Sequence, residues 1–258
     1  MGLHAMAEGR LPIMRATVLV YGDLLRMARA MPALLAAAAI ILLAINGLDQ
    51  VLPLGMKAAV PVEFVMSVAR TFLMTPVLIA VHRFIVLREV TPRYRLAPAE
   101  PRFIRFFGWS LALAAISLAT GLIESALHAI SVPSFAVMII VFAVVIGGCI
   151  VAVRLTVLFP AIAVDAPGAT ARQAFADTRG YFWNIAIIGF VAALPIMAAT
   201  MALMFVFWPK FPADGAWSAH AVNALAMTVI DLLGYPLFAA VAARIFEGLA
   251  GPVLRPAG

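Results

Sequence analysis

Six long apolar runs constrain the fold of this chain more than any other feature of its sequence. A helix needs about 20 mostly apolar residues to cross the hydrocarbon core of a bilayer, and each run is long enough. Because 65% of the residues are hydrophobic and only 12% are charged, a soluble domain could not cover this much apolar surface. We therefore predict an all-α polytopic membrane bundle, formed as one integral membrane domain over residues 1–258. The predicted spans are about 31–52, 60–87, 107–130, 134–163, 184–208 and 218–247.

Residues 11–30, ahead of the first run, have the apolar period of an amphipathic helix. On a helical projection Val18, Tyr21 and Leu25 fall on one face, and Asp23 falls on the opposite face. A helix of this kind lies flat on a membrane surface. We predict an interfacial helix here.

A second interfacial helix is predicted at 168–180, between the fourth and fifth runs. Thr170 and Gln173 have the spacing of a capping box at a helix start, and Gly180 supplies a residue that ends helices without strain. The aromatic cluster at 181–183 is typical of the membrane–water boundary. We interpret this stretch as an elbow helix on the cytoplasmic side.

The elbow helix has two chemically distinct sides. Ala174, Phe175 and Thr178 share one side, and Gln173 and Asp177 lie on the other. We expect Phe175 to face apolar surroundings at the interface.

Lysine and arginine residues gather in alternate segments between the runs. Four precede the first run, six lie between Arg83 and Arg105, two lie on the elbow helix, and two lie at or after the end of the last run. The opposite side has only Lys57 and Lys210. Because cytoplasmic loops carry the excess of basic residues, both termini are predicted to be cytoplasmic. Abundant alanine and the excess of arginine over lysine are typical of a GC-rich bacterial genome, so we expect a bacterial inner membrane.

The net charge of +6 points to anionic lipid headgroups as partners, and not to nucleic acid, because the basic residues fall mostly beside the spans. The segment from 88 to 105 is rich in proline and arginine and is predicted to be a solvated linker at headgroup level. The candidate headgroup ligands are Arg83, Arg88, Arg172, Arg179 and Arg244.

Charged side chains inside the bilayer are the most informative residues, because each costs about 2.5 to 3.5 kcal/mol to insert. Arg70 and Asp231 lie roughly 15 and 20 Å below the outer boundary at about 1.5 Å per residue. We predict that they contact each other, with Glu124 as the alternative partner of Arg70. Arg154 lies close enough to the cytoplasmic end of its span to reach headgroups. Glu124 and His128, four residues apart, are interpreted as a polar pair at the outer end of the third span.

Recognisable catalytic and metal-binding motifs are missing from the sequence. The histidines do not match a metal-ligand spacing, and Cys149 is the only cysteine. Nucleophile-elbow, His-Glu-x-x-His and P-loop motifs are also missing. We therefore expect no cofactor, no metal and no catalytic residue; an enzyme would need one polar cavity that unites Glu124, His128 and Asp231.

A repeat of three hairpins is one interpretation of the second, fourth and sixth runs. Each has a proline or glycine seven or eight residues before an arginine, at Arg83, Arg154 and Arg244. The other interpretation is that arginine simply collects at cytoplasmic helix ends. We favour the second.

Two regions together resemble a known family. One runs from Arg154 through Pro160 to Gly180 and Trp183, with an alanine-rich amphipathic helix between them. The other is the order Pro236, Ala242, Ala243, Arg244, Glu247, Gly248. Both are similar to bacterial six-span membrane proteins related to the membrane domain fused to some glycerophosphodiester phosphodiesterases. The resemblance implies six spans and a lipid-associated role, and it supplies no catalytic residues.

Two functions follow from these observations. The first is a non-enzymatic inner-membrane protein with a lipid-associated role. The alternative is a membrane-spanning permease subunit, because ARQAFADTRG at 171–180 followed by AALP at 192–195 is close to the loop that such permeases present to their ATPase. Whether the protein forms a homo-oligomer or binds a transporter partner stays open.

Overall fold

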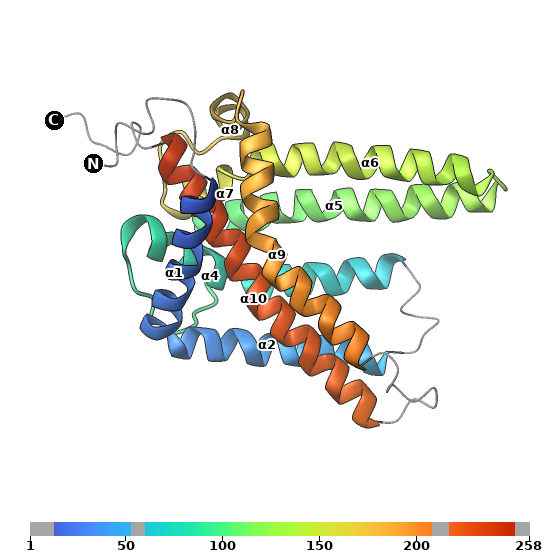
Figure 1. Ribbon diagram of the computed structural model, residues 1–258, viewed down its shortest axis with the longest axis horizontal. Helices are drawn as coiled ribbons and strands as arrows, with labels where there is room; N and C mark the ends of the chain where they lie inside the picture. Colours follow the sequence, from blue (N-terminus) through green and yellow to red (C-terminus); the bar gives the residue numbers. More distant parts are fainter. Residues whose placement is uncertain (1–12, 53–59, 208–216, 251–258) are drawn as a thin grey trace.

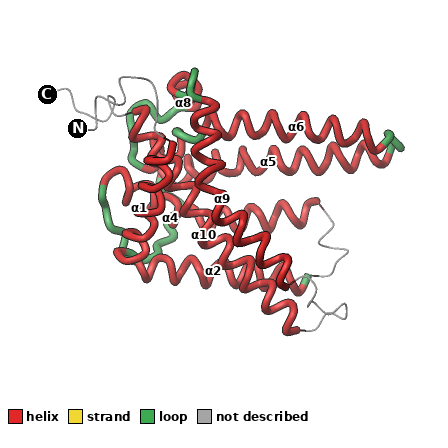
Figure 2. The backbone as a smooth tube through the Cα atoms, in the orientation of Figure 1, coloured by secondary structure: helices red, strands yellow, loops and turns green. Residues whose placement is uncertain are grey.

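The computed structural model describes residues 13–52, 60–207 and 217–250, and these ranges contain helices, turns and no strand (Figure 2). The all-α prediction is therefore confirmed. The helices are α1 (Ile13–Ala30), α2 (Pro32–Val51), α4 (Val60–Leu87), α5 (Pro101–Ala129), α6 (Ser134–Leu155), α7 (Leu158–Ala163), α8 (Ala171–Asp177), α9 (Phe182–Phe207) and α10 (Trp217–Ala250).

Within the described residues, six helices are long and apolar enough to cross a membrane. The prediction of six spans, and with it of an integral membrane protein, is confirmed. These segments are Pro32–Val51, Phe64–Leu87, Pro101–Ala129, Ser134–Leu155, Phe182–Leu203 and His220–Leu249.

The fourth span differs from the prediction of one helix over 134–163. The helix ends at Leu155, and α7 begins at Leu158. Pro160 explains the break, because proline lacks an N–H and its ring clashes with the carbonyl four residues earlier, that of Thr156. The Thr156 hydroxyl turns back and donates a hydrogen bond to the Ala152 carbonyl at 3.0 Å.

Helix α10 forms the centre of the bundle and packs against α1, α2, α4, α7 and α9. Helices α5 and α6 lie side by side as a hairpin that runs in roughly the same direction as α2 and stands apart from it (Figure 1). A Cβ atom on Gly148 would lie 2.7 Å from Cγ2 of Ile116, so glycine permits this close approach. In the most apolar stretch of α5 and in that of α6, only 6% of the residues are buried, against 39% in α10. The hairpin therefore has a large apolar surface that can face lipid.

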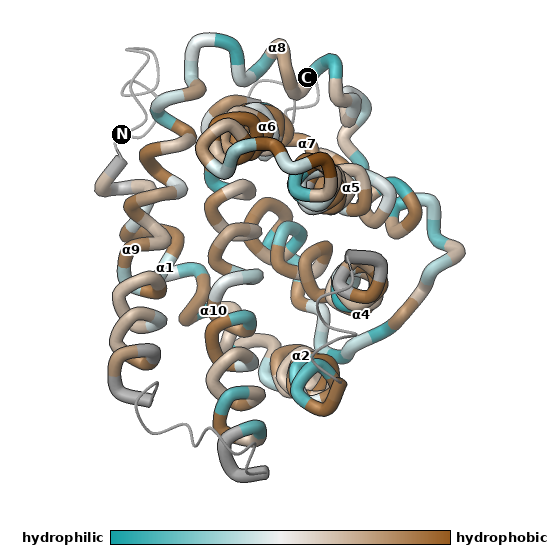
Figure 3. The backbone as a smooth tube through the Cα atoms, turned by 90° about the vertical axis from the view of Figure 1, so that its right-hand side faces the viewer, coloured by the Kyte–Doolittle hydropathy of each residue, from teal (hydrophilic) through white to brown (hydrophobic). Residues whose placement is uncertain are grey.

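One end of the bundle collects most of the basic segments, and we call it the arginine-rich end: α1, residues 88–105, α8 and the last turns of α10 (Figure 1). The turn between α5 and α6 lies at the opposite end. Hydrophilic residues concentrate along α8 and the segment before α5 (Figure 3). Most segments predicted to be cytoplasmic therefore share one end.

Helix α1 crosses the arginine-rich end instead of continuing the direction of α2 (Figure 1). Pro32 separates the two helices, because the residue before a proline disfavours helical geometry. The predicted apolar face is exposed at Val18 and Leu25, as an interfacial helix requires, whereas Asp23 on the opposite face is fully buried against the bundle.

The segment from 88 to 100 is non-helical, as its prolines predict, and most of its residues are exposed, as a solvated linker requires. Residues 101–105, which were predicted to belong to the linker, are instead the first residues of α5. Two hydrogen bonds also anchor the segment to the bundle. The Thr91 amide donates to Sδ of Met31 at 3.2 Å, and the Tyr94 hydroxyl donates to the Leu73 carbonyl at 2.9 Å. Burial raises the pKa of Tyr94. Arg88 has a φ of 59°, a left-handed conformation that ends α4.

The elbow helix is α8, inside the predicted range of 168–180. The Thr170 side chain accepts a hydrogen bond from the Gln173 amide at 3.2 Å, so the predicted N-cap is confirmed. The helix ends at Asp177, three residues before Gly180, which has a φ of 85° in the turn that follows. A capping box also requires the Gln173 side chain to bond back to the Thr170 amide, and this part of the prediction is wrong. The Gln173 side chain instead donates to Asp177 at 2.7 Å.

Candidate functional site

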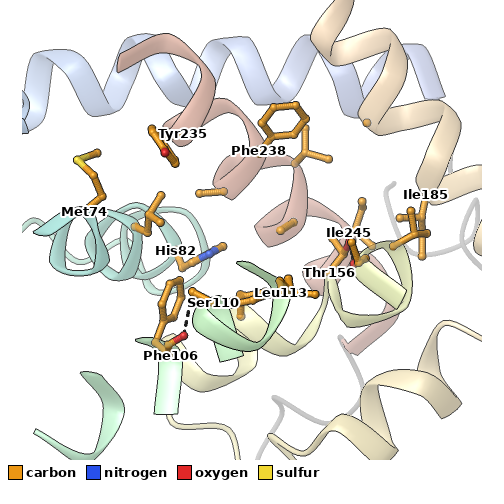
Figure 4. Close-up of a pocket in the computed structure, with 18 of the residues that line it drawn as sticks. Met74, His82, Phe106, Ser110, Leu113, Thr156, Ile185, Tyr235, Phe238 and Ile245 are labelled. Carbon is orange, nitrogen blue, oxygen red and sulfur yellow. Dashed lines mark hydrogen bonds between the residues drawn. The ribbon is translucent and has the colours of Figure 1, made fainter. Parts of the chain in front are cut away.

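A cavity of about 470 Å³ lies between α4, α5, α6, α9 and α10, where the α5–α6 hairpin meets the rest of the bundle. Its wall is mostly apolar, with Met74, Leu113, Phe238 and Ile245 among the residues that line it (Figure 4). The volume falls within the range of about 300–1,000 Å³ that is usual for small-molecule sites. The side chains on this wall suit a long apolar ligand.

Two of the four hydroxyl side chains on the cavity wall donate hydrogen bonds to their own helices. Ser110 donates to the Phe106 carbonyl at 2.9 Å, and Thr156 donates to the Ala152 carbonyl at 3.0 Å. This back-bonding is usual for serine and threonine in apolar helices. These hydroxyl oxygens can still accept a hydrogen bond, but their protons are committed.

His82 differs from those hydroxyl groups. Its side chain is 2% exposed and points into the cavity (Figure 4), and its Nδ1 has no hydrogen-bond partner among the residues that the structure describes. The ring packs beside Phe106, with ring centroids 5.8 Å apart. A buried polar atom without a partner costs about 1–3 kcal/mol. Less than 1 Å² of Nδ1 is accessible, so a ligand in the cavity does not reach this atom in the structure.

Helix α4 places His82 on the cavity wall through the segment that follows Pro76. Met74, Leu78 and His82 recur every four residues and line the same cavity, as a helical face requires. Arg83, next in sequence, points elsewhere and donates to the Ala163 carbonyl at 3.0 Å. His82 therefore lies near the arginine-rich end of the cavity.

A polar cluster joins α2, α4 and α10 within the spans. The predicted contact is present: Nη1 of Arg70 lies 3.9 Å from Oδ2 of Asp231. Asn46 bridges the pair, because it accepts from Arg70 Nη2 at 2.8 Å and donates to Asp231 at 3.2 Å and to Thr228 at 3.3 Å. The two charged side chains are 28% and 23% exposed, so they are only partly buried. Tyr235 lies beside Arg70 and also lines the cavity.

A second charged cluster lies at the arginine-rich end around the fully buried Asp23. Its Oδ2 accepts from Arg244 Nε at 2.5 Å, and its Oδ1 accepts from Arg26 Nη2 at 2.5 Å. Nη1 of Arg88 lies 3.7 Å from Oδ1, and Nη1 of Arg244 also donates to Glu247 at 2.6 Å. One carboxylate thus ties α1 to α10 and to the segment after α4.

The five predicted headgroup ligands fall into two groups. Arg83 and Arg244 are 17% and 14% exposed and form ion pairs with carboxylates of the protein, which leaves them less surface for a headgroup than the other three; their role as headgroup ligands stays a prediction. Arg88 is 55% exposed, although it lies near Asp23. Arg172 and Arg179 are exposed on α8 and just after it.

The other intramembrane candidates lie apart from one another. Glu124 and His128 are both exposed near the far end of α5 and line a recess against the start of α6. Asp231 does not line that recess, so the cavity that an enzyme would need is not formed by these three residues. Among the described residues, Glu124 forms no ion pair with Arg70. Arg154 lies in the last turn of α6 and is partly exposed.

Sequence reasoning missed three residues that the structure makes prominent. His82 was one of the histidines without a metal-ligand spacing, and Asn46 was one polar residue in the first apolar run. Asp23 was assigned to a face without a partner. The available signal was the same for all three: a polar side chain on or between strongly apolar helical faces needs a partner or a ligand.

Comparison with known proteins gives no assignment. No family model matches the chain, and no curated protein or solved structure is significantly similar to it. The family resemblance noted above therefore stays a prediction.

Proposed function

We propose that this integral membrane protein is a non-enzymatic lipid-binding protein that holds an acyl chain in the cavity between α4, α5, α6, α9 and α10. Exposed arginines at the arginine-rich end, Arg172 and Arg179 in particular, bind the anionic headgroups of the same or neighbouring lipids. The observation that carries the proposal is the apolar wall of a cavity of about 470 Å³ within a bundle of membrane-spanning helices.

The surroundings of the cavity support an acyl chain over a polar substrate. Among the residues that line it, none is Asp, Glu, Lys or Arg. An acyl chain that enters the cavity from the bilayer leaves one apolar environment for another, so the hydrophobic effect contributes little. Packing of the chain against the cavity wall must therefore supply the affinity. The headgroup contributes separately, at about 1 kcal/mol for each lysine or arginine near an anionic membrane surface.

The proposal places the arginine-rich end in the cytoplasm of a bacterium, with the protein in the inner membrane. Single cysteines in a Cys149→Ala background test this orientation. With an impermeant maleimide on intact cells, Ser131→Cys at the α5–α6 turn should be labelled and Arg95→Cys should be protected. Labelling of residue 95 alone would reverse the orientation.

Native mass spectrometry of the protein extracted with its lipids tests lipid binding. Gly189 lines the cavity, and a Cβ atom built on it meets nothing within 4 Å, so Gly189→Trp should fill the cavity at little cost to the backbone. Gly147 also has open space at its Cβ but does not line the cavity, which makes Gly147→Trp the matched control. We expect the first variant to lose most retained lipid and the second to keep it.

Equal lipid retention by the two tryptophan variants would contradict the proposal, and a copurifying ATPase would favour the permease alternative. The headgroup contribution is measured in the same spectra. Replacing Arg172 and Arg179 by glutamine should lower the ratio of phosphatidylglycerol to phosphatidylethanolamine several-fold, whereas lysine at both positions should preserve it.

A further inference from the structure

The α5–α6 hairpin carries a second recess, near the end of the bundle opposite the arginine-rich end (Figure 1). Its volume is about 390 Å³, and no residue that lines it also lines the cavity described above. Helix α5 supplies Glu124 and His128, and α6 supplies the remainder: Ser134, Val137, Met138, Val141, Phe142 and Val145. The recess is therefore polar toward the turn between the helices and apolar away from it.

Glu124 gives this recess a negative charge without a counter-ion. Its side chain is exposed and forms no ion pair or hydrogen bond with another described residue. The same is true of His128, one helical turn further along α5. Among the residues that line the recess, none is Lys or Arg. The recess therefore attracts a cation from outside the protein.

The position of Glu124 along α5 places its carboxylate at a membrane boundary. Arg105, near the start of α5, is anchored at the arginine-rich end, where it donates to the Ala169 carbonyl. Between Arg105 and Glu124 the helix carries no charged residue. The two residues are separated by about 28.5 Å at roughly 1.5 Å per residue, which is close to the hydrocarbon thickness of about 30 Å. Glu124 therefore lies where the hydrocarbon core meets the headgroups of the other leaflet.

The apolar part of the recess continues from Glu124 toward the membrane interior. The close approach of Ile116 to Gly148 sets the register of the antiparallel hairpin, so Glu124 is level with about residue 140 on α6. Val141 and Val145, one helical turn apart, then extend inward from that level. An acyl chain whose headgroup lies at Glu124 packs along these two residues.

We propose that this recess binds a phospholipid with a primary ammonium headgroup, of which phosphatidylethanolamine is the simplest, in the leaflet opposite the arginine-rich end. The ammonium group donates charge-assisted hydrogen bonds to the Glu124 carboxylate, and the Ser134 and His128 side chains donate to the adjacent phosphate. The acyl chain packs on the apolar α6 residues of the recess. The site goes beyond the proposed function, because its charge preference is opposite to that of the arginine-rich end.

Two lipids with the same chains and different donors test the inference. Dioleoyl phosphatidylethanolamine has an ammonium group with three N–H donors, whereas dioleoyl phosphatidylcholine has a methylated cation without any. In native mass spectrometry titrations of the wild-type protein, the ethanolamine lipid should bind about three- to tenfold more tightly, the range expected of one net hydrogen bond.

Variants locate this preference. Glu124→Gln keeps the size of the side chain and removes its charge, so the affinities for the two lipids should agree within about twofold. Glu124→Asp keeps a carboxylate and should retain part of the preference. Glu100→Gln is the matched control, because it removes one exposed negative charge at the other end of the same helix and should keep the wild-type ratio.

Equal binding of both lipids by the wild type would overturn the proposal, and so would a preference that survives in Glu124→Gln. The wild-type comparison needs no substitution, so misfolding of a variant does not obscure it. A dimer in the same spectra that disappears in Glu124→Gln would assign the recess to a second copy of the chain and would also overturn it. Gly189→Trp should leave the ethanolamine preference unchanged, so this site and the proposed function fail separately.

Discussion

Removing the carboxylate of Asp23 should destabilise the protein far more than removing a carboxylate that is equally well paired but exposed. Asp23 is fully buried and is contacted by Arg26, Arg88 and Arg244. Asp23→Ala leaves Arg244, which is 14% exposed, without its closest counter-ion. Breaking a buried ion pair on one side costs about 3–5 kcal/mol.

The lower end of that range applies here, because Glu247 stays within 2.6 Å of Arg244 and compensates part of its charge. A loss of about 3 kcal/mol corresponds to a fall in Tm of roughly 6–12 °C for a chain of this size. The control is Asp165→Ala. Asp165 also pairs with arginines, Arg102 and Arg83, but its side chain is 52% exposed, so losing the carboxylate should cost at most about 1 kcal/mol. Its φ of 52° is left-handed, a conformation that alanine adopts less readily than aspartate, so backbone strain adds up to roughly 1 kcal/mol.

Thermal unfolding of purified variants in detergent, at one salt concentration, compares the two. A double variant adds a second check: combining Asp23→Ala with Arg244→Met should cost less than the sum of the single changes, because the buried cation is then gone as well. Equal Tm shifts for Asp23→Ala and Asp165→Ala would refute the reasoning that burial makes this cluster important.

Three further predictions follow from the geometry. Arg70→Asp and Asp231→Arg should each lower Tm, and the double exchange should recover at least half of the loss because the Asn46 amide can rotate to serve the reversed pair; no recovery would mean that the ion pair contributes nothing. A spin label at residue 175 should be protected from water-soluble relaxation agents and one at residue 177 exposed, and equal accessibility would contradict the interfacial placement of α8. Tyr94→Phe removes one partly buried hydrogen bond to Leu73, so it should lower stability by about 0.5–1.5 kcal/mol, and an unchanged Tm would show that the segment from 88 to 100 is not held by it.

The location of the helices could be read from the sequence because it depends on local properties. Apolar length gave the bounds of four of the six helices to within about three residues, whereas the third begins earlier than expected, at Pro101, and the fourth ends earlier, at Leu155. Pro32 and Pro101 each lie at the start of a helix. The break in the fourth span was visible at Pro160, but its position after Leu155 depends on a clash one helical turn earlier.

Depth along a helix is also a local property, and it was enough to pair Arg70 with Asp231. What it could not supply was the third partner. Asn46 lies on a different helix, and only the packing of α2 against α10 brings its amide between the two charges.

For the same reason, the polar sites were harder to predict from the sequence than the helices. An amphipathic projection shows that Asp23 lies opposite the apolar face of α1, but it does not tell whether that side meets water or another helix; the structure places Arg244, distant in sequence, against it. His82 likewise reads as one polar residue in an apolar span, and only the packing of α4 against α5 buries its ring beside Phe106. Local composition determines which segments enter the membrane, since each residue carries its own transfer free energy, whereas the partner of a polar group is set by which helices pack together, and that depends on contacts between residues far apart in the chain.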